Sequence, residues 1–305
     1  MKSEIHLSAE VADALRNNQA VVALESTLIT HGLPYPANVE TALAMEASVR
    51  ESGAIPATIA ILKGKITVGL TVDAIEGLGT LPPGSVRKCS RRDFAIAVGL
   101  RQDAATTVAG TMIVAHQAGI RVFSTGGIGG VHRRQPFDVS ADLMELGRTP
   151  VAVVCSGAKS ILDLPLTLEV LETQGVPVIG LNTDTLPAFY SRSSGLPIDT
   201  CVETPQQAAE IIAAAHRLNM WHGILITVPV PAGEELPPQV AEVAIQQATE
   251  EASAQGIHGK AVTPFVLKRV AELTEGGSRR ANVALLVNNA RVGGQIASKL
   301  QILMS

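Results

Sequence analysis

The chain alternates between two hydrophobic patterns along its whole length. Short runs that are almost entirely apolar, such as residues 20–24 (AVVAL) and 151–155 (VAVVC), are typical of strands buried on both faces. Longer segments with apolar residues at helical spacing, such as residues 36–53 and 205–219, separate these runs. The alternation predicts a three-layer α/β/α fold, in which helices cover both faces of a mostly parallel mixed sheet.

Local signals mark where several elements begin and end. Ser8 is a candidate cap for an opening helix, and Pro36 and Gly53 stand where a helix would begin and end. Residues 63–65 (KGK) predict a hairpin turn between two short strands. No repeat or linker divides the sequence. We therefore expect residues 1–305 to form one domain, with the hairpin as a local antiparallel element.

Composition narrows the class of protein. Of the 305 residues, 46% are hydrophobic and 17% are charged, which predicts extensive burial, in part against copies of the same chain. The net charge of −4 argues against a nucleic-acid groove, and the 3% of aromatic residues argues against recognition by base stacking. The three cysteines form no CxxC pair and predict buried free thiols. Without an apolar signal core or a run long enough to span a bilayer, we expect a cytoplasmic protein with no membrane partner.

Polar residues of unusual kinds collect at the predicted strand ends. In an α/β sheet, ligands bind beyond the carboxyl ends of the strands. Four separate segments place polar or glycine-rich residues there: Glu25-Ser26-Thr27, Lys88-Cys89-Ser90, residues 125–133 (TGGIGGVHR) and Lys159. The repetition of this pattern predicts a ligand site at that edge of the sheet.

Lys159 is the most informative of these residues. It follows an apolar run and stands where we expect a helix to begin, near Ser160, with Pro165 in its first turn. The positive end of a helix dipole and apolar neighbours both disfavour the ammonium form, so they favour a neutral, nucleophilic amine that can form an imine. A lysine that reaches solvent or binds an anion is the alternative interpretation.

The glycine-rich segment and the carboxylates after it allow several interpretations. Glycines let backbone amides approach an anion, and His132 or Arg133 would add charge, but a surface loop is equally compatible with the pattern. Ser140 is a candidate helix cap that places Asp142 in the first turn. Asp138 and Asp142 are candidates to hold a hard divalent cation through oxygen and water, and plain helix capping is the alternative.

Other polar residues are candidates for proton transfer or binding. Glu25 directly follows a buried strand, where a carboxylic acid near Lys88 can donate a proton, and a structural salt bridge is the alternative. Asn282 and the pair Asn288-Asn289 lie in an apolar segment, where a buried amide needs a partner from the helix backbone or a substrate. His116 lies on an apolar helix and is interpreted as a packing residue.

Taken together, these motifs resemble those of the pseudouridine-5'-phosphate glycosidases, the family that includes the proteins called indigoidine synthase A. The resemblance runs in order from about Glu25 to Ala297. The motifs that carry it are LESTLITHGLPYP, KCSRRD, TTVAGTM, STGGIGGVHR, FDVSADLMEL, CSGAKSILDL, GKAVTPFVL and the NNA of the last helix.

The resemblance implies a particular reaction. It is the reversible cleavage of pseudouridine 5'-phosphate into uracil and ribose 5-phosphate. Because the broken bond joins two carbons, glycosidase chemistry with two carboxylates does not suffice. The implied route opens the ribose ring, bonds a lysine to C1', releases uracil and hydrolyses the imine. On this sequence Lys159 matches the nucleophile, and Glu25 matches the acid that protonates the ring oxygen.

The resemblance also implies binding residues and an assembly. Asp138 matches the metal ligand for one Mn²⁺ per subunit, held otherwise through water, and Mg²⁺ is an alternative. A homotrimer is implied as well. The residues that match substrate contacts are Lys88, Val108, Thr125, His132, Ser140, Ala141, Asp142 and Asn282, with Asn289 as an alternative to Asn282.

Two other functions stay open. A Schiff-base aldolase or lyase acting on another sugar phosphate would use Lys159 equally well. A non-catalytic accessory protein of a pigment pathway would keep the fold without turnover. The joint presence of Glu25, Lys88, Asp138 and Lys159 favours an enzyme with a small-molecule substrate and no nucleic-acid partner.

Overall fold

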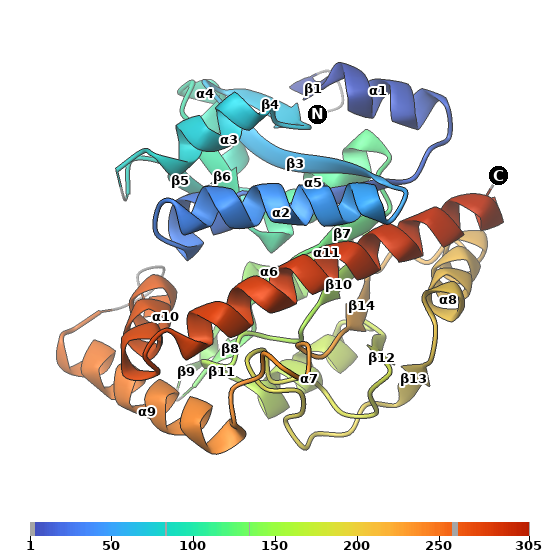
Figure 1. The fold of residues 1–305 in the computed structure, drawn as a ribbon. Coiled ribbons are helices and arrows are strands. Elements are labelled where there is room, and N and C mark those ends of the chain that lie inside the picture. The colour runs from blue at the N-terminus through green and yellow to red at the C-terminus, as the bar shows by residue number, and fades with distance from the viewer. Residues whose placement is uncertain (1–3, 83, 134, 258–261, 305) are drawn as a thin grey trace.

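The structure is a computed structural model that describes residues 4–82, 84–133, 135–257 and 262–304. One large mixed sheet forms its centre, with helices on both faces (Figure 1). The predicted α/β/α architecture is confirmed. Residues 259–261 of the motif GKAVTPFVL lie outside the described residues.

The sheet contains eleven strands and is parallel except around β3. The main path runs β1-β4-β3-β2-β7-β10-β14-β12-β13, and the parallel pair β5–β6 joins β3 through β6. The strands of the main path in chain order are β1 (Ile5–Leu7), β2 (Val21–Leu24), β3 (Ile55–Leu62), β4 (Lys65–Val68), β7 (Val122–Ser124), β10 (Ala152–Cys155), β12 (Val178–Leu181), β13 (Thr200–Val202) and β14 (Ile224–Thr227). The pair beside it is β5 (Arg87–Cys89) and β6 (Ala104–Thr106).

The central strands are buried on both faces, as their continuous apolar runs predicted. Every residue of β2, β7, β10 and β14 is buried. The hairpin expected at residues 63–65 is the antiparallel turn between β3 and β4. Lys63 and Gly64 both have a positive φ, of 49° and 80°, which a tight hairpin turn of this kind requires.

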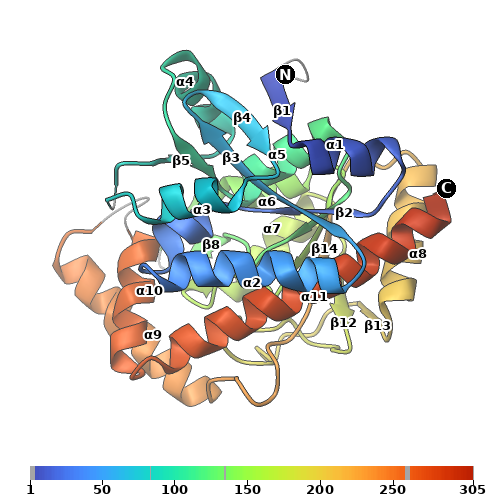
Figure 2. The same ribbon diagram turned by 45° about the horizontal axis from the view of Figure 1, so that its top comes forward.

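Eleven α-helices cover the sheet in the described residues. They are α1 (Ala9–Arg16), α2 (Ala37–Glu51), α3 (Val72–Gly79), α4 (Phe94–Gly99), α5 (Val108–Ala118), α6 (Ala141–Leu146), α7 (Leu164–Thr173), α8 (Pro205–Arg217), α9 (Pro238–Ala254), α10 (Val262–Leu273) and α11 (Gly277–Met304). A π-helical turn, η2 (Leu28–Gly32), and a 3₁₀ turn, η3 (Arg91–Asp93), add to them. Helices α2 and α11 lie side by side on one face of the sheet, and α5 and α6 pack together on the other (Figure 2).

Helix α11 crosses the sheet and packs on β2, β7 and β10 as well as on α2 and α8. Its Gly293-Gly294 pair allows this close approach. A Cβ on Gly294 would stand 2.6 Å from the Cβ of Ser52, and a Cβ on Gly293 would stand 3.2 Å from that of Ser124. The helix therefore brings its preceding turns to the carboxyl ends of the central strands.

A second sheet has three short strands, in the order β11-β8-β9. Strands β8 (Val131–His132) and β11 (Leu162–Asp163) contain two residues each, and β9 (Gln135–Val139) contains five. These strands are too short to show a recognisable hydrophobic period, so they were not predicted from the sequence. This small sheet joins the glycine-rich segment to the chain that follows Lys159.

Two further expectations can be compared with the fold. Cys89 and Cys155 are buried free thiols, but Cys201 is exposed, so the prediction of burial is wrong for the third cysteine. Cys201 lies on β13, the strand at one end of the sheet in the part of the chain that the structure describes. Within the described ranges, no helix has the length and apolar character to cross a membrane.

Candidate active site

Three of the four polar segments leave neighbouring strands at the same edge of the sheet. Strands β2, β7 and β10 are adjacent and parallel, with Leu24 opposite Ser124 and Ser124 opposite Val154. The segments that begin at Glu25 and Thr125 and the one that carries Lys159 therefore start side by side. The predicted grouping of these segments at the carboxyl edge is present in the fold.

Glu25 is held by hydroxyl groups. The Thr125 hydroxyl donates to Oε1 of Glu25 and the Thr27 hydroxyl donates to Oε2. Thr125 is buried, whereas Glu25 is partly exposed. Because a hydroxyl can donate or accept, these partners suit both the carboxylate and the protonated acid.

Lys159 is fixed through its backbone. Its N–H donates to the Ile128 carbonyl at 3.1 Å, and its own carbonyl accepts from Leu162 at 3.0 Å. Lys159 is partly exposed between buried Ala158 and Ser160. Its amine is near enough to Cys155 for its charge to act on that thiol. Burial raises the pKa of Cys155 to about 12, and backbone hydrogen bonds and the charge of Lys159 oppose the rise.

The expected helix start near Ser160 is wrong. Helix α7 begins at Leu164, capped by Asp163, which accepts from Leu166 N at 3.0 Å. The two residues before the helix form β11 and pair with His132 and Val131 of β8 instead. The dipole argument for Lys159 therefore fails. The position of Pro165 in the first turn is confirmed.

Asp142 joins two segments that the sequence had singled out separately. Its Oδ1 accepts from Ala109 N at 2.9 Å, and its Oδ2 accepts from Gly129 N at 2.9 Å. Ala109 follows Val108, the buried first residue of α5. Gly129 has to be glycine, because a Cβ there would stand 2.3 Å from the Ser140 hydroxyl oxygen.

Ser140 caps α6 as predicted, with its hydroxyl accepting from Asp142 N at 3.2 Å. Ala141 is the first residue of the helix and is exposed. The helix therefore places its buried Asp142 against the glycine-rich segment, while Ala141 beside it faces outward. Whether Ser140, Ala141 and Asp142 contact substrate stays a prediction.

His132 and Asp138 lie on the small sheet. His132 pairs with Leu162, three residues after Lys159, and Asp138 is on β9 beside Val139, which pairs with Val131. Both are partly exposed. The ladder between β8 and β11 therefore brings His132 close in the fold to the chain that carries Lys159.

Asp138 stays the predicted ligand for a cation. Among the residues described in the structure, no group of three or more His, Cys, Asp and Glu side chains is placed to hold a metal ion. Asp142, the second candidate, already accepts two backbone hydrogen bonds. A single carboxylate suits a hard cation such as Mn²⁺ or Mg²⁺ that keeps most of its water ligands.

Arg133 is not available for an anion in the way that the sequence suggested. Its guanidinium donates to the carbonyls of Ser160 at 2.9 Å and Leu162 at 3.2 Å. It also forms an ion pair with Glu242 of α9, at 2.6 Å. Arg133 therefore fastens the turn that follows Lys159.

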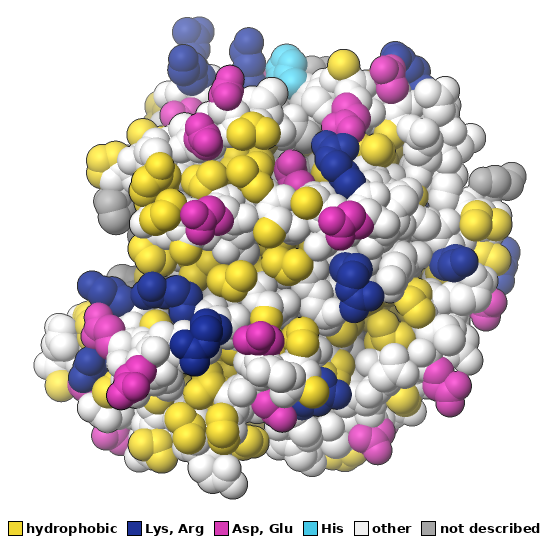
Figure 3. Space-filling view, in the orientation of Figure 1, with side chains coloured by type: hydrophobic (Ala, Val, Ile, Leu, Met, Phe, Trp, Pro, Cys, Tyr) yellow, Lys and Arg dark blue, Asp and Glu magenta, His cyan; other side chains and the backbone are white. Residues whose placement is uncertain are grey.

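A large cavity of about 1110 Å³ contains two further predicted residues, Lys88 and Asn282. It lies between η2, the start of β5, α10 and the beginning of α11. Lys268 and Arg279 add exposed cations to its wall. Lys and Arg side chains gather over α10 and the first turns of α11 in Figure 3. Glu25 and Lys159 are not among the residues that line this cavity.

The two candidate asparagines of α11 differ in their surroundings. Asn289 is fully buried, and its Nδ2 donates to the Thr125 carbonyl at 2.9 Å and to the Ser156 hydroxyl at 3.1 Å. Asn282 lines the cavity and is partly exposed. Asn289 therefore supports the strand-end backbone, and Asn282 is the one of the two that lines a cavity.

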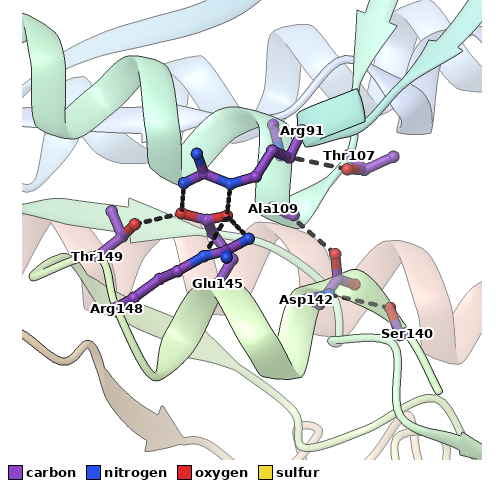
Figure 4. Close-up of polar contacts among 9 residues, drawn as sticks. Arg91, Thr107, Ala109, Ser140, Asp142, Glu145, Arg148 and Thr149 are labelled. Atoms are coloured by element: carbon purple, nitrogen blue, oxygen red, sulfur yellow. Dashed lines mark hydrogen bonds and ion pairs between the residues drawn. The ribbon is translucent and has the colours of Figure 1, made fainter. Parts of the chain in front are cut away.

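Sequence reasoning missed an ion cluster beside these segments. Glu145, on α6, is enclosed by Arg91, Arg148 and Thr149 (Figure 4). One signal was present, because Glu145 stands in FDVSADLMEL between two apolar residues, Met144 and Leu146, of which Leu146 is buried. The partner Arg91 lies 54 residues away along the chain, in the motif KCSRRD, so the pair could not be read from spacing.

These observations define an α/β/α protein with a glutamate and a lysine after the ends of β2 and β10, two parallel strands that flank β7. The chain belongs to the family described as indigoidine synthase A like protein, whose sequence profile matches residues 10–299. The predicted resemblance to this family, and with it the prediction of an enzyme, is confirmed.

Several relatives carry the same name. Proteins named pseudouridine-5'-phosphate glycosidase from Caldanaerobacter subterraneus subsp. tengcongensis and Herpetosiphon aurantiacus are 54% and 55% identical to this chain, and 98% of each chain is covered. The protein of that name from Paracoccus denitrificans is 53% identical, over 97% of this chain and 98% of its own.

Two solved structures share the fold. The prealnumycin C-glycosynthase AlnA, in complex with ribulose 5-phosphate, superposes with a TM-score of 0.90 at 41% identity, covering 98% of both chains. An indigoidine synthase A-like protein from Thermotoga maritima superposes with a TM-score of 0.88 at 35% identity, covering 97% of this chain and 96% of its own.

Proposed function

We propose that the protein is a pseudouridine-5'-phosphate glycosidase, which reversibly cleaves the carbon–carbon bond between uracil and ribose 5-phosphate. The names of relatives more than 50% identical over nearly the whole chain support the activity. The structural observation that carries the proposal is the placement of Glu25 and Lys159 after β2 and β10, the two strands that flank β7.

In the proposed mechanism Glu25 acts first. It protonates the ribose ring oxygen as the bond between that oxygen and C1' breaks, with electrons supplied by the uracil ring. Thr27 and Thr125 hold the carboxyl group throughout, because their hydroxyls can accept from the acid and donate to the carboxylate.

Lys159 then forms the covalent intermediate. Its neutral amine adds to C1', and the lone pair of its nitrogen next forms a C1'=N bond as the bond to uracil breaks. Uracil carbon takes up a proton, so it leaves as the neutral base. Water hydrolyses the imine, which frees Lys159 and the aldehyde of ribose 5-phosphate.

The remaining predicted residues bind and orient the substrate. Lys88 and Asn282, in the cavity, would bind the phosphate end, where Lys268 and Arg279 add positive charge. Asp138 would hold one Mn²⁺ or Mg²⁺ ion per subunit, which supplies positive charge for binding an anionic substrate. We assign further substrate contacts to Val108, Thr125, His132, Ser140, Ala141 and Asp142. A cytoplasmic homotrimer is part of the same proposal.

A second candidate is a Schiff-base enzyme that acts on another sugar phosphate. The similarity to AlnA, whose structure contains ribulose 5-phosphate, favours it, because the same lysine chemistry applies to a sugar carbonyl. Product analysis with both sugar phosphates separates this candidate from the glycosidase.

The decisive experiment is the condensation of uracil with ribose 5-phosphate. We expect pseudouridine 5'-phosphate to form. Its formation should stop when a chelator is added and resume when Mn²⁺ or Mg²⁺ is supplied. Borohydride reduction in the presence of ribose 5-phosphate should add mass to the peptide that contains Lys159. Condensation with ribulose 5-phosphate alone would favour the second candidate. Binding of ribose 5-phosphate without any turnover would favour an accessory protein.

A further inference from the structure

Glu145 is a buried carboxylate that the proposed chemistry does not use. Its side chain has no exposed surface, yet two arginines reach it from the solvent side (Figure 4). Arg91 forms a parallel fork, from Nε to Oε2 at 2.8 Å and from Nη2 to Oε1 at 2.6 Å. Arg148 contacts Oε2 at 3.2 and 3.4 Å, and the Thr149 hydroxyl donates to Oε1. The fork with Arg91 is the tighter of the two arginine contacts.

The carboxylate is held in its charged form. Burial by itself would raise the pKa of Glu145. The hydrogen bonds from Arg91 and Thr149 and the charges of both arginines outweigh that effect, so the pKa lies below its ordinary value. A bidentate bond between ionised groups is stronger than a neutral one and fixes orientation as well as distance.

Arg91 belongs to a rigid segment that also carries Lys88. In β5, Lys88 pairs with Ala105 and Cys89 pairs with Thr106. The Cys89 carbonyl accepts from Thr107 N at 3.0 Å, which ties the end of β5 to the entry of α5. Lys88 is only three residues from Arg91, so both belong to the segment whose end the Cys89 carbonyl ties to the entry of α5.

Helix α6 fixes the opposite side of the same region. Asp142 and Glu145 are three residues apart and therefore lie on one face of the helix. Asp142 holds the backbone of Ala109 and Gly129, while Glu145 holds Arg91. One short helix thus connects three segments that carry predicted substrate contacts.

We propose that Glu145 is a positioning residue, which acts through Arg91 to hold Lys88 in register with residues 140–142. The inference rests on the proposed function, because it takes Lys88 and residues 140–142 to contact one substrate. A displacement of about 1 Å at such a contact can lower the rate on the order of 10²-fold. The tight fork from Arg91 therefore matters more than the looser contact from Arg148.

The test compares Arg91→Met with Arg148→Met. The two arginines contact the same carboxylate and are equally exposed, at 49% and 48%, but only Arg91 belongs to the segment of Lys88. We expect Arg91→Met to lower kcat/KM for pseudouridine 5'-phosphate by about tenfold to 10²-fold, chiefly through a higher KM. Arg148→Met should stay within about twofold of wild type, since Arg148 makes the longer contacts with Glu145, at 3.2 and 3.4 Å, and is not part of the segment of Lys88. Arg91→Lys, which keeps the charge without the fork, should fall between them.

Several outcomes would overturn the inference. One is an Arg91→Met variant with wild-type kcat/KM. Another is an equal decrease of kcat/KM in both arginine variants that is proportional to the decrease in their thermal stability. Calorimetric binding of ribose 5-phosphate should show the same contrast without turnover. A wild-type protein that releases no uracil would contradict the proposed function instead. Glu145 stays in place in these variants, with Thr149 and one arginine still bound to it, so the test does not require a Glu145 variant to fold.

Discussion

Glu25 and Glu145 are two carboxylates near strand ends or segments that the sequence had singled out, but their surroundings differ. Glu25 is partly exposed and accepts hydrogen bonds from two threonine hydroxyls. Glu145 has no exposed surface and is bound by two guanidinium groups and one hydroxyl. Hydroxyls tolerate a carboxyl group in either protonation state, whereas guanidinium groups only donate and so hold the charged form.

This difference in hydrogen-bond partners indicates which of the two carboxylates can take part in proton transfer. A proton donor must gain and lose a proton during turnover, which the surroundings of Glu25 permit. Glu145 is held ionised, so its role is mechanical: it ties the segment of Arg91 to α6. In the proposed mechanism Glu25 and Lys159 therefore form the chemical region, and the cluster of Arg91, Glu145 and Arg148 forms its support.

The largest effect is expected at Lys159 in the chemical region. Lys159→Ala should lower uracil release on the order of 10³-fold or more, because it removes the nucleophile. The fold should be retained, since the backbone of Lys159 and not its amine makes the bonds to Ile128 and Leu162. Uracil release and circular dichroism measure the two properties. Retained activity in a folded variant would contradict a covalent role for Lys159.

Glu25→Gln should come next, with a fall of about 10²-fold or more in kcat, because the amide cannot supply the proton. Thr125→Val is the matched control, since it removes one hydroxyl partner and leaves the acid in place. We expect a smaller loss for Thr125→Val and an altered pH profile for its kcat. Equal activity of Glu25→Gln and wild type would place the proton donor elsewhere.

Glu145→Gln tests whether the charge of Glu145 stabilises the fold, through the pH dependence of the free energy of unfolding. Because the folded pKa of Glu145 is lowered from 4.5, its ion pairs contribute stability that is fully present above about pH 4.5. This contribution is lost as the pH falls through the lower folded pKa. In urea unfolding, the free-energy difference between wild type and Glu145→Gln should therefore be large at pH 7 and shrink toward pH 3. A difference that does not change with pH would show that the charge of Glu145 is not responsible.

The smallest effect is expected at the cationic wall of the cavity, outside both clusters. Lys268→Gln and Arg279→Gln should each raise KM by at most about fivefold at low salt, since one exposed charge pair is worth up to about 1 kcal/mol. The effect should fade as salt is added. Arg217→Gln on α8 is the control, an exposed cation that does not line the cavity. An equal rise of KM in the Arg217→Gln variant would contradict phosphate binding at this wall.

Local sequence determined much of the architecture. Buried strands, the hairpin at residues 63–65 and the caps at Ser8 and Ser140 depend on residues within a few positions of one another, and these expectations agree with the fold. The approach of Glu25 to Thr125 followed from a general rule, because parallel strands end at one edge. The helix start at Ser160 failed because two residues of β11 pair with β8, a choice that the sequence around Lys159 does not record.

Tertiary packing decided the partners of the buried polar groups. Glu145 meets Arg91 across 54 residues, and Asn289 meets the Thr125 carbonyl across 164. A buried charge or amide must find partners, so the sequence indicates that such partners exist. Which groups they are depends on how the helices pack on the sheet, and for α11 this approach required two adjacent glycines. The grouping of polar residues at the strand ends could therefore be predicted from the sequence, whereas the contacts that hold these residues in place were set by the fold.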